Sequence, residues 1–482
     1  MKILNMKFEK IASRLVVLII GLSLWACIIP SVQTRKENRA LPEAFSRASD
    51  TANISKVNWR QYFTDTNLTA LIDTALMNNQ ELNILLQEIA ISKNEVKARK
   101  GEYLPFIGVG GGAGLDKVGR YTRNGVIEKN HEIADGKEFP EPLGDFNFGA
   151  YASWELDVWK KLRNSRKSAM MRYLASIDGR NFMVTNLVSE IADSYFELLA
   201  LDNQLEILKY NVEIQQKALS IVKMQKIAAR VTELAVRKFE AEVLLNQSRQ
   251  YEISQHIIIA ENRINFLLGR FPQHIPRDSL SFTELMPFNG QAGIPTQLLT
   301  NRPDVRRAEL ELMASNLDVK VAKANFYPSF SIKAGVGYQA FNTSHLLMSP
   351  ESMIYSLAGD LMVPVVNRNA IKANYYSASA RQIQAVYNYE RSILSAYIDV
   401  TNQLAKISML EKSYQIRSKQ VQALTRSIHI STGLFKSARA DYMEVLMTQR
   451  DALNSKMELI ETKRKLLNAK VNVYKALGGG WR

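Results

Sequence analysis

The strongest constraint on the fold is that the second half of the chain repeats the pattern of the first. A shift of 209 positions places Ala229-Arg230 on Ala438-Arg439 and Leu268-Gly269 on Leu477-Gly478. Self-similarity at a fixed offset identifies the unit from which a fold is built. We therefore predict two internal structural repeats, and we expect the matching stretches near residues 229 and 438 to be the tips of two helical hairpins.

Each half begins with a helical pattern and continues into two strands. In the first half, apolar residues recur at helical spacing from Asp65 to just before Pro105, since the residue preceding a proline disfavours the helical region. The period then changes to two, which predicts strands with one apolar face. The alternating segments are residues 107–115, 146–158, 330–338 and 353–365. They predict β-hairpins over residues 103–159 and 326–366, the first with a polar loop at 116–145.

Long helical patterns follow both hairpins. The stretch from Lys160 to Lys226 would form a helix of roughly 100 Å at ~1.5 Å per residue. A helix of that length is typical of a coiled coil or a helical barrel. The next pattern, from Val236 to Leu267, has apolar residues at alternating spacings of three and four. The tips between the paired helices are predicted near residues 226–233 and 436–442.

Four strands of about ten residues have the length of transmembrane β-strands. A sheet of four strands leaves unpaired edges, which lipid does not tolerate, and it is too small to close on itself. Two copies would give about eight strands, a barrel filled by its own side chains, whereas three copies enclose a channel. We therefore predict an α+β membrane protein: a homotrimer with a 12-stranded β-barrel, four strands per chain, continued by a long α-helical coiled-coil barrel.

The N-terminal segment has the features of a lipoprotein signal peptide. A basic start is followed by an apolar run from Leu15 to Ala26, too short to span a membrane as a helix. The run ends in Leu24-Trp25-Ala26-Cys27, which resembles a bacterial lipobox, and Cys27 is the single cysteine of the 482 residues. We expect cleavage of residues 1–26 and lipidation of Cys27, palmitate included. The alternative is an uncleaved anchor with an ordinary thiol.

These signals divide the chain into consecutive segments. After the signal peptide we expect a lipidated strap at residues 27–63, a first repeat at 64–270, a connector rich in proline at 271–294, a second repeat at 295–477 and a tail at 478–482.

Three motifs and the doubled layout suggest a family. The motifs are Leu299-Thr-Asn-Arg-Pro-Asp-Val305, Tyr327-Pro328 and Val473-Tyr-Lys-Ala-Leu-Gly-Gly-Gly-Trp481, and with the layout they cover nearly the whole mature chain. The sequence resembles the outer membrane efflux protein family, the TolC- and OprM-like channels, in its lipoprotein branch. The resemblance implies a passive conduit for drugs and small toxic compounds. It implies a lipid-anchored trimer in the outer membrane of a Gram-negative bacterium that extends into the periplasm. A periplasmic membrane-fusion adaptor would connect it to an inner-membrane pump of the resistance–nodulation–division class.

The resemblance also places an aperture at the second tip. Glu444 falls on a position that carries a carboxylate ring, Met447 falls where many relatives have an aspartate, and Met443 lies beside them. Three Glu444 carboxylates around a symmetry axis would repel one another and attract cations. Met447 would replace a second acidic ring with an apolar constriction. The alternative for Glu444 is an exposed glutamate on a helix.

A further set of tip residues is expected to hold the closed state and to meet the adaptor. Thr232 and Glu233 match positions that bond to the neighbouring helix pair, and we predict that Glu233 pairs with Arg439 as a latch. Phe435 and Asp441 belong to the same set. The alternative is a surface ion pair worth about 0–1 kcal/mol. The expected adaptor contacts are Ala228, Ala229, Arg230, Val231, Ser437, Ala438, Ala440 and Tyr442.

Nothing in the sequence indicates an enzyme. The five histidines show neither metal nor catalytic spacing, and we expect no cofactor and no metal site. The formal charge is +15, but the basic residues are scattered along the helices, so we expect no nucleic-acid partner. Two other functions stay open. One is a conduit for protein secretion of the type I kind, and the other is a lipid-anchored coiled-coil scaffold without a pore.

Overall fold

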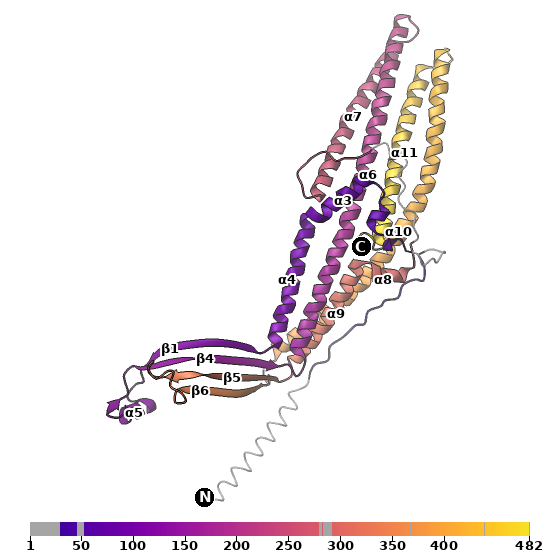
Figure 1. The fold of residues 1–482 in the computed structure, drawn as a ribbon. Helices are drawn as coiled ribbons and strands as arrows, with labels where there is room; N and C mark the ends of the chain where they lie inside the picture. Colours follow the sequence, from indigo (N-terminus) through magenta and orange to yellow (C-terminus); the bar gives the residue numbers. More distant parts are fainter. Residues whose placement is uncertain are drawn as a thin grey trace. The chain divides into compact units, whose positions relative to one another are not determined.

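The computed structural model describes residues 29–45, 53–278, 282, 292–366, 368–437 and 439–481. Figure 1 shows the course of the chain. The chain forms two compact units, each assembled from separate stretches of sequence. The first unit contains residues 90–173 and 310–386 with the described part of residues 1–36. The second contains residues 37–89, 174–309 and 387–482.

The first unit contains an antiparallel sheet of four strands in the order β1-β4-β5-β6. The strands are β1 (Phe106–Asp116), β4 (Leu143–Leu156), β5 (Ser329–Ala340) and β6 (Met353–Met362). The first hairpin pairs from Phe106↔Ser153 to Asp116↔Leu143. β4 and β5 join the two hairpins in a ladder that runs from Phe146↔Ala340 to Leu156↔Phe330. The four predicted strands are confirmed, and β1 and β6 are the outer strands of this sheet (Figure 1).

The stretch between β1 and β4 is more ordered than a polar loop. It contains α5 (Arg123–Asn130) and a small hairpin of β2 (Glu132–Ala134) and β3 (Lys137–Glu138). The Thr122 side chain caps α5 by accepting a hydrogen bond from the Gly125 amide, and Arg120 pairs with Glu141 at 2.8 Å. These elements are too short to give a periodic pattern in the sequence.

The helices follow the predicted order along the chain. They are α2 (Trp59–Tyr62), α3 (Thr66–Asn78), α4 (Gln80–Tyr103), α6 (Lys161–Ile227), α7 (Glu233–Leu267), α8 (Leu298–Asn301), α9 (Pro303–Ala324), α10 (Asn369–Lys436) and α11 (Tyr442–Ala476), with short 3₁₀ turns η1 (Ile54–Lys56) and η3 (Pro295–Gln297). α6 has 67 residues and α10 has 68, whereas α7 and α11 have 35 each. Among the described residues, none of the helices combines the length and the apolar character that crossing a membrane would require.

The first helical pattern differs from the expectation of one continuous helix. The chain leaves the helical conformation at Asn79, which has a ψ of 125°. The Asn79 amide donates to the carbonyl of Leu267 at 2.9 Å, and its oxygen accepts from the Leu82 amide at 3.0 Å. Asparagine readily satisfies backbone groups in this way at a helix end, which explains the break between α3 and α4.

Part of the expected strap belongs to the core of the second unit. Trp59, Tyr62 and Phe63 are almost fully buried. Tyr62 stacks on Tyr474 with ring centroids 4.2 Å apart, and its hydroxyl donates to the carbonyl of Lys470 at 2.9 Å. The segment is too short for a periodic pattern, so its aromatic residues gave no signal of burial.

The described residues 29–45 form neither a helix nor a strand, and they contact helices. In the first unit, Ile29 and Val32 pack on the apolar cluster that contains Phe326 and Tyr375. The Ser379 hydroxyl donates to the carbonyl of Gln33 at 2.6 Å. In the second unit, Arg39 pairs with Glu309 at 2.8 Å, and Phe45 stacks on Tyr397. Cys27 lies outside the described residues.

One buried arginine joins three elements of the second unit. Arg302 follows α8 and is 6% exposed. Its guanidinium donates to the carbonyl of Ala476 at the end of α11, at 3.1 Å, and pairs with Asp304 at 2.6 Å and with Asp399 of α10 at 3.3 Å. The contact with α11 places a positive charge at a helix C-terminus, where the helix dipole favours it.

Candidate functional site: the two helical tips

The first tip is a tight turn between α6 and α7. The backbone amide of Ala229 donates to the carbonyl of Lys226, and that of Arg230 donates to the carbonyl of Gln225, both at 2.9 Å. These two bonds close the end of α6 in a Schellman motif. Ala229 takes the left-handed conformation, with a φ of 52°. Glycine usually occupies that place because a Cβ atom is disfavoured there by about 1–2 kcal/mol.

Thr232 and Glu233 have defined partners within this tip. The Thr232 hydroxyl caps α7 by accepting from the Ala235 amide at 3.4 Å. Glu233 forms ion pairs with Lys226 and, at 2.8 Å, with Arg237. The hydrogen bond from Lys226 is the main reason that the pKa of Glu233 is lowered. The Glu233 carboxylate is therefore already engaged by its own hairpin.

The second tip is built in a related way. The backbone amide of Ser437 donates to the carbonyl of Gly433 at 3.1 Å, and that of Arg439 donates to the carbonyl of Leu434 at 2.9 Å. Asp441 precedes α11, but its side chain makes no capping hydrogen bond there. Arg439 and Asp441 are exposed, and Phe435 is half-buried. Ala438 lies outside the described residues. The Glu233–Arg439 latch stays a prediction, and it would require Glu233 to exchange partners.

An apolar cluster connects the two tips. Val222, Ala235, Val236 and Phe239 of the first hairpin form a buried cluster with Leu446 of the second. Val231 and Tyr442, two of the expected adaptor contacts, pack against it as half-buried side chains. The family resemblance did not predict this contact between the two tips. The signal was present, because Val236, Phe239 and Leu446 belong to the apolar seams that predicted the helices.

The remaining tip residues differ in how far their side chains are exposed to solvent. Ala228, Ala229, Arg230 and Ser437 are exposed, and Ala440 is half-buried. Glu444 and Met447 are exposed and stand three positions apart on α11, so they share one face of the helix. Met443 is half-buried. The aperture set therefore stays a prediction, and Glu233 has other partners than Arg439.

No group of three or more histidine, cysteine, aspartate or glutamate side chains that could hold a metal ion occurs among the described residues. The tips offer backbone turns, an apolar cluster and exposed charged side chains. These are features of a surface that contacts protein and solvent.

Comparisons with known proteins identify a family and several relatives of this chain. The family model described as "Outer membrane efflux protein" matches residues 71–270 and 294–479. The chain is 24% identical to the probable outer membrane lipoprotein SilC of Salmonella typhimurium over 94% of this chain and 96% of that protein. It is 25% identical to the cation efflux system protein CusC of Escherichia coli K12 over 96% and 98%.

Solved structures share the fold. The structure of the open state of the MtrE outer membrane channel of Neisseria gonorrhoeae has a TM-score of 0.80 and 23% identity, and the match covers 94% of this chain and 98% of that one. Because the family model matches most of the residues, in both halves of the sequence, this chain belongs to the outer membrane efflux protein family.

Proposed function

We propose that three copies of this outer membrane efflux protein form a passive conduit that is built from two internal repeats per chain. The observation that carries the proposal is the four-stranded sheet, whose outer strands β1 and β6 each have one neighbour within it. Lipid does not tolerate unpaired strand edges, so these strands require neighbours from other copies. Three copies would give a barrel of about twelve strands, which leaves room for a channel.

The long helices support a tube beyond the barrel. α6 and α10 have nearly equal lengths, of 67 and 68 residues, and the helices that follow them have 35 each. Equal pairs are expected if two repeats contribute equivalent staves to one wall. The tips would form the closed end, with Glu444, Met447 and Met443 at the aperture, and would meet a periplasmic adaptor that joins an inner-membrane pump of the resistance–nodulation–division class.

The proposed cargo is drugs and small toxic compounds. The relatives support small cargo, because CusC is named for cation efflux and another relative, TtgI of Pseudomonas putida, is named for toluene efflux. A protein-secretion conduit is therefore the weaker alternative. A scaffold without a pore would leave the four-stranded sheet without a purpose.

Two measurements test the proposal. The full-length protein, purified in detergent, should have the mass of three copies and should give stepwise conductance in planar bilayers. In cells, copurification with a tagged adaptor and pump should succeed, and deletion of the gene should increase accumulation of a fluorescent dye that complementation reverses. A particle with the mass of one copy and no conductance would refute the conduit.

The lipid anchor has its own test. We propose that Cys27 carries it, and the name of the relative SilC, a probable outer membrane lipoprotein, supports a lipid anchor. Wild-type protein should incorporate labelled palmitate, and the variant Cys27→Ser should not. Equal labelling of both would remove Cys27 as the attachment site.

A further inference from the structure

The end of the sheet that joins the helices carries a group of aromatic side chains. β1 and β5 begin there and β4 and β6 end there, next to α4, α6, α9 and α10 (Figure 1). Trp159, between β4 and α6, stacks on Tyr327 with ring centroids 4.7 Å apart. Phe326, which precedes Tyr327, packs edge-on against Tyr375 of α10. Tryptophan and tyrosine are enriched where a membrane meets water, which indicates that this end of the sheet lies at a membrane surface.

The start of the described chain supports the same position. Ile29 and Val32 pack on the apolar cluster that contains Phe326 and Tyr375. Ile29 follows Cys27, the proposed site of the lipid anchor, by only two residues. Because an extended chain spans at most about 3.6 Å per residue, a lipidated Cys27 would hold Ile29 within about 7 Å of the anchor. The aromatic cluster would then lie at the level of the lipid headgroups.

Four basic residues surround these aromatic side chains. Lys323 lies at the end of α9, Lys372 lies in the first turn of α10, and Lys160 directly precedes α6. The three lysines are exposed, and they make no ion pair in the part of the chain that the structure describes. The guanidinium of Arg368 lies over the ring of Phe326, 4.8 Å from its centroid. We call Lys160, Lys323, Arg368 and Lys372 the junction patch.

Lys160 has an unusual backbone conformation. Its φ is 59°, in the left-handed region that residues with a Cβ atom rarely adopt. Its amide donates to the carbonyl of Asp157 at 3.2 Å, and its carbonyl accepts from the amide of Asn164 at 3.0 Å, so neighbouring groups hold the turn in place. Strained conformations of this kind concentrate at functional positions. The strain at Lys160 is consistent with a role for the charge that it places at the corner between β4 and α6.

The carboxylates closest in sequence to the three lysines already have other cationic partners. The pairs are Glu155 with Lys161, Asp157 with Arg163, Asp318 with Arg172, and Asp360 with Lys333. The sequence also contains no aspartate or glutamate between Asp360 and Glu390, a stretch that includes Arg368 and Lys372. The lysines of the junction patch therefore add positive charge that nearby acidic residues do not neutralise.

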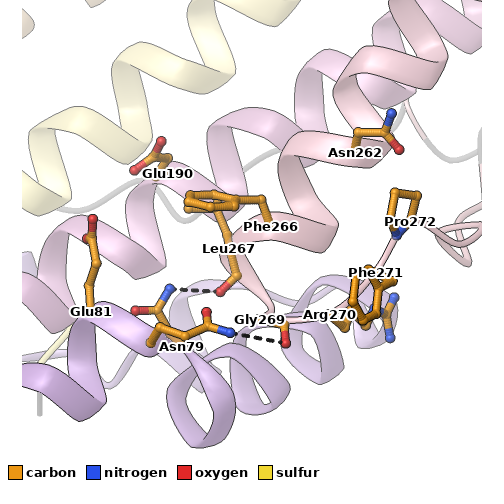
Figure 2. A pocket seen from close by; sticks show the side chains of 11 residues that line it. Asn79, Glu81, Glu190, Asn262, Phe266, Leu267, Gly269, Arg270, Phe271 and Pro272 are labelled. Carbon is orange, nitrogen blue, oxygen red and sulfur yellow. Dashed lines mark hydrogen bonds between the residues drawn. The ribbon is translucent and has the colours of Figure 1, made fainter.

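A groove in the second unit provides a contrast. Figure 2 shows Phe266 and Arg270 at this groove, which has a volume of about 610 Å³ and is also lined by the carboxylates of Glu81 and Glu190. Arg270 donates to the side chain of Asn265 at 2.7 Å. Here two carboxylates accompany one guanidinium, so the lining carries no excess of positive charge. The junction patch combines aromatic rings with such an excess.

We propose that the junction patch binds the phosphate groups of anionic phospholipids, such as phosphatidylglycerol, in the membrane leaflet that faces the helices. The proposal rests on the membrane conduit and its lipid anchor, and it names a class of lipid that surrounds the conduit. Headgroup phosphates lie just outside the hydrocarbon core, at the level of interfacial aromatic residues. Each lysine or arginine near an anionic membrane surface strengthens binding by about fivefold.

Spin-labelled lipids test the patch in the full-length protein, reconstituted in phosphatidylcholine vesicles. Electron paramagnetic resonance should show that the protein restricts labelled phosphatidylglycerol severalfold more than labelled phosphatidylcholine. The combined variant Lys160→Gln, Lys323→Gln and Lys372→Gln should lower this preference by about threefold or more. Replacement of the same three lysines by arginine should keep it. In 1 M sodium chloride, where the Debye length is about 3 Å, the wild-type preference should fall.

A matched control removes the same charge elsewhere. Lys412→Gln, Lys419→Gln and Lys436→Gln change three exposed lysines further along α10 and should keep the wild-type preference. An equal loss in this control would show that net charge, and not the patch, selects the lipid. Loss of the preference in sodium phosphate, but not in sodium chloride of the same ionic strength, would assign the patch to free phosphate and overturn the lipid.

The native mass and conductance of the same samples separate the two ideas. A conducting particle of three copies that restricts both lipids equally would overturn the patch and leave the conduit standing. A particle of one copy without conductance would refute the conduit, and with it the membrane position of the patch. If the combined variant does not insert, the wild-type protein decides, because a preference that survives 1 M sodium chloride would contradict an electrostatic site.

Discussion

Asp193 illustrates how burial can work against stability. Its carboxyl group lies between α6 and α11, where it accepts a hydrogen bond from Asn472 at 3.2 Å. Burial raises the pKa of Asp193 to about 6, and the positive charges of Lys406, Lys475 and Arg464 offset this only in part. The folded protein thus binds the proton more tightly than the unfolded chain. This contributes stability at pH below about 4, and that contribution is lost as the pH rises through about 6.

We therefore expect Asp193→Asn to stabilise the protein at pH 7.5 by up to about 3 kcal/mol, since one pKa unit corresponds to about 1.4 kcal/mol. The gain should shrink towards pH 4.5, where the wild-type carboxyl group is protonated in the folded state. Thermal unfolding in detergent at the two pH values measures it. Glu206→Gln, an exposed carboxylate on the same helix, is the matched control. An equal gain at both pH values would contradict a titration of Asp193.

The motif that contains Arg302 indicated the family but not the contacts of this side chain. The sequence identified it as part of the Leu299–Val305 motif, which resembles the family, but gave it no role. Its partners Asp399 and Ala476 are 97 and 174 positions away along the chain. Only the fold brings them together at the end of α11. Local patterns predict helices and strands, whereas such long-range polar contacts leave no periodic signal.

The contact between the two helical hairpins depends on a small apolar cluster. Leu446 is 8% exposed and packs with Val222, Val236 and Phe239. We expect Leu446→Ala to weaken this contact by about 2–4 kcal/mol, because a buried leucine truncated to alanine loses packing and leaves a cavity. Hydrogen–deuterium exchange at residues 218–239 should become faster, while exchange in the sheet stays unchanged.

A matched control is available at the same tip. Met224→Ala removes a side chain that is 62% exposed and should leave exchange as in the wild type. If the closed state depends on the cluster, cells with Leu446→Ala should also become more permeable to large antibiotics. Unaltered exchange in the Leu446 variant would mean that the hairpins are held together elsewhere.

The insertion between β1 and β4 is separable from the sheet. Asp116 pairs directly with Leu143, so the ladder is complete before the insertion begins. We expect that replacement of residues 117–142 by Asn-Gly, which favours a two-residue hairpin turn, will preserve membrane insertion, native mass and conductance. The control is deletion of the same number of residues from α6. Loss of insertion or of oligomeric mass would show that α5 and its neighbours hold the sheet or the assembly.

The sequence predicted most of the helices and strands of the molecule. Long helices and alternating strands can be recognised in a sequence because their apolar residues recur with periods of 3.6 and 2 residues. The short elements did not, as α5 and the aromatic turn at residues 59–63 show. The break at Asn79 was also missed, because a single asparagine does not interrupt the apolar pattern around it.

The pairing of whole hairpins is a property that the sequence left open. It predicted two hairpins but not that β4 lies beside β5, since this ladder joins residues almost two hundred positions apart. The outcome matters for the assembly. A sheet of order β1-β4-β5-β6 has one edge from each hairpin, so in the proposed trimer neighbouring copies would meet through strands from different halves of the chain.

The proposed ring of Glu444 carboxylates would form only in an assembly of three copies. One chain contributes one Glu444, which is exposed at the start of α11 beside Met447. Three copies around an axis would concentrate three negative charges at the aperture, where they attract cations and repel anions. We expect Glu444→Gln to reduce the preference of the pore for potassium over chloride about twofold or more, with the reversal potential in a potassium chloride gradient moving towards zero. Glu128→Gln on α5, in the other compact unit, should leave it unchanged. If Glu444→Gln has no effect while Asp451→Asn, one heptad further along α11, does, the constriction lies deeper in the tube than the tip.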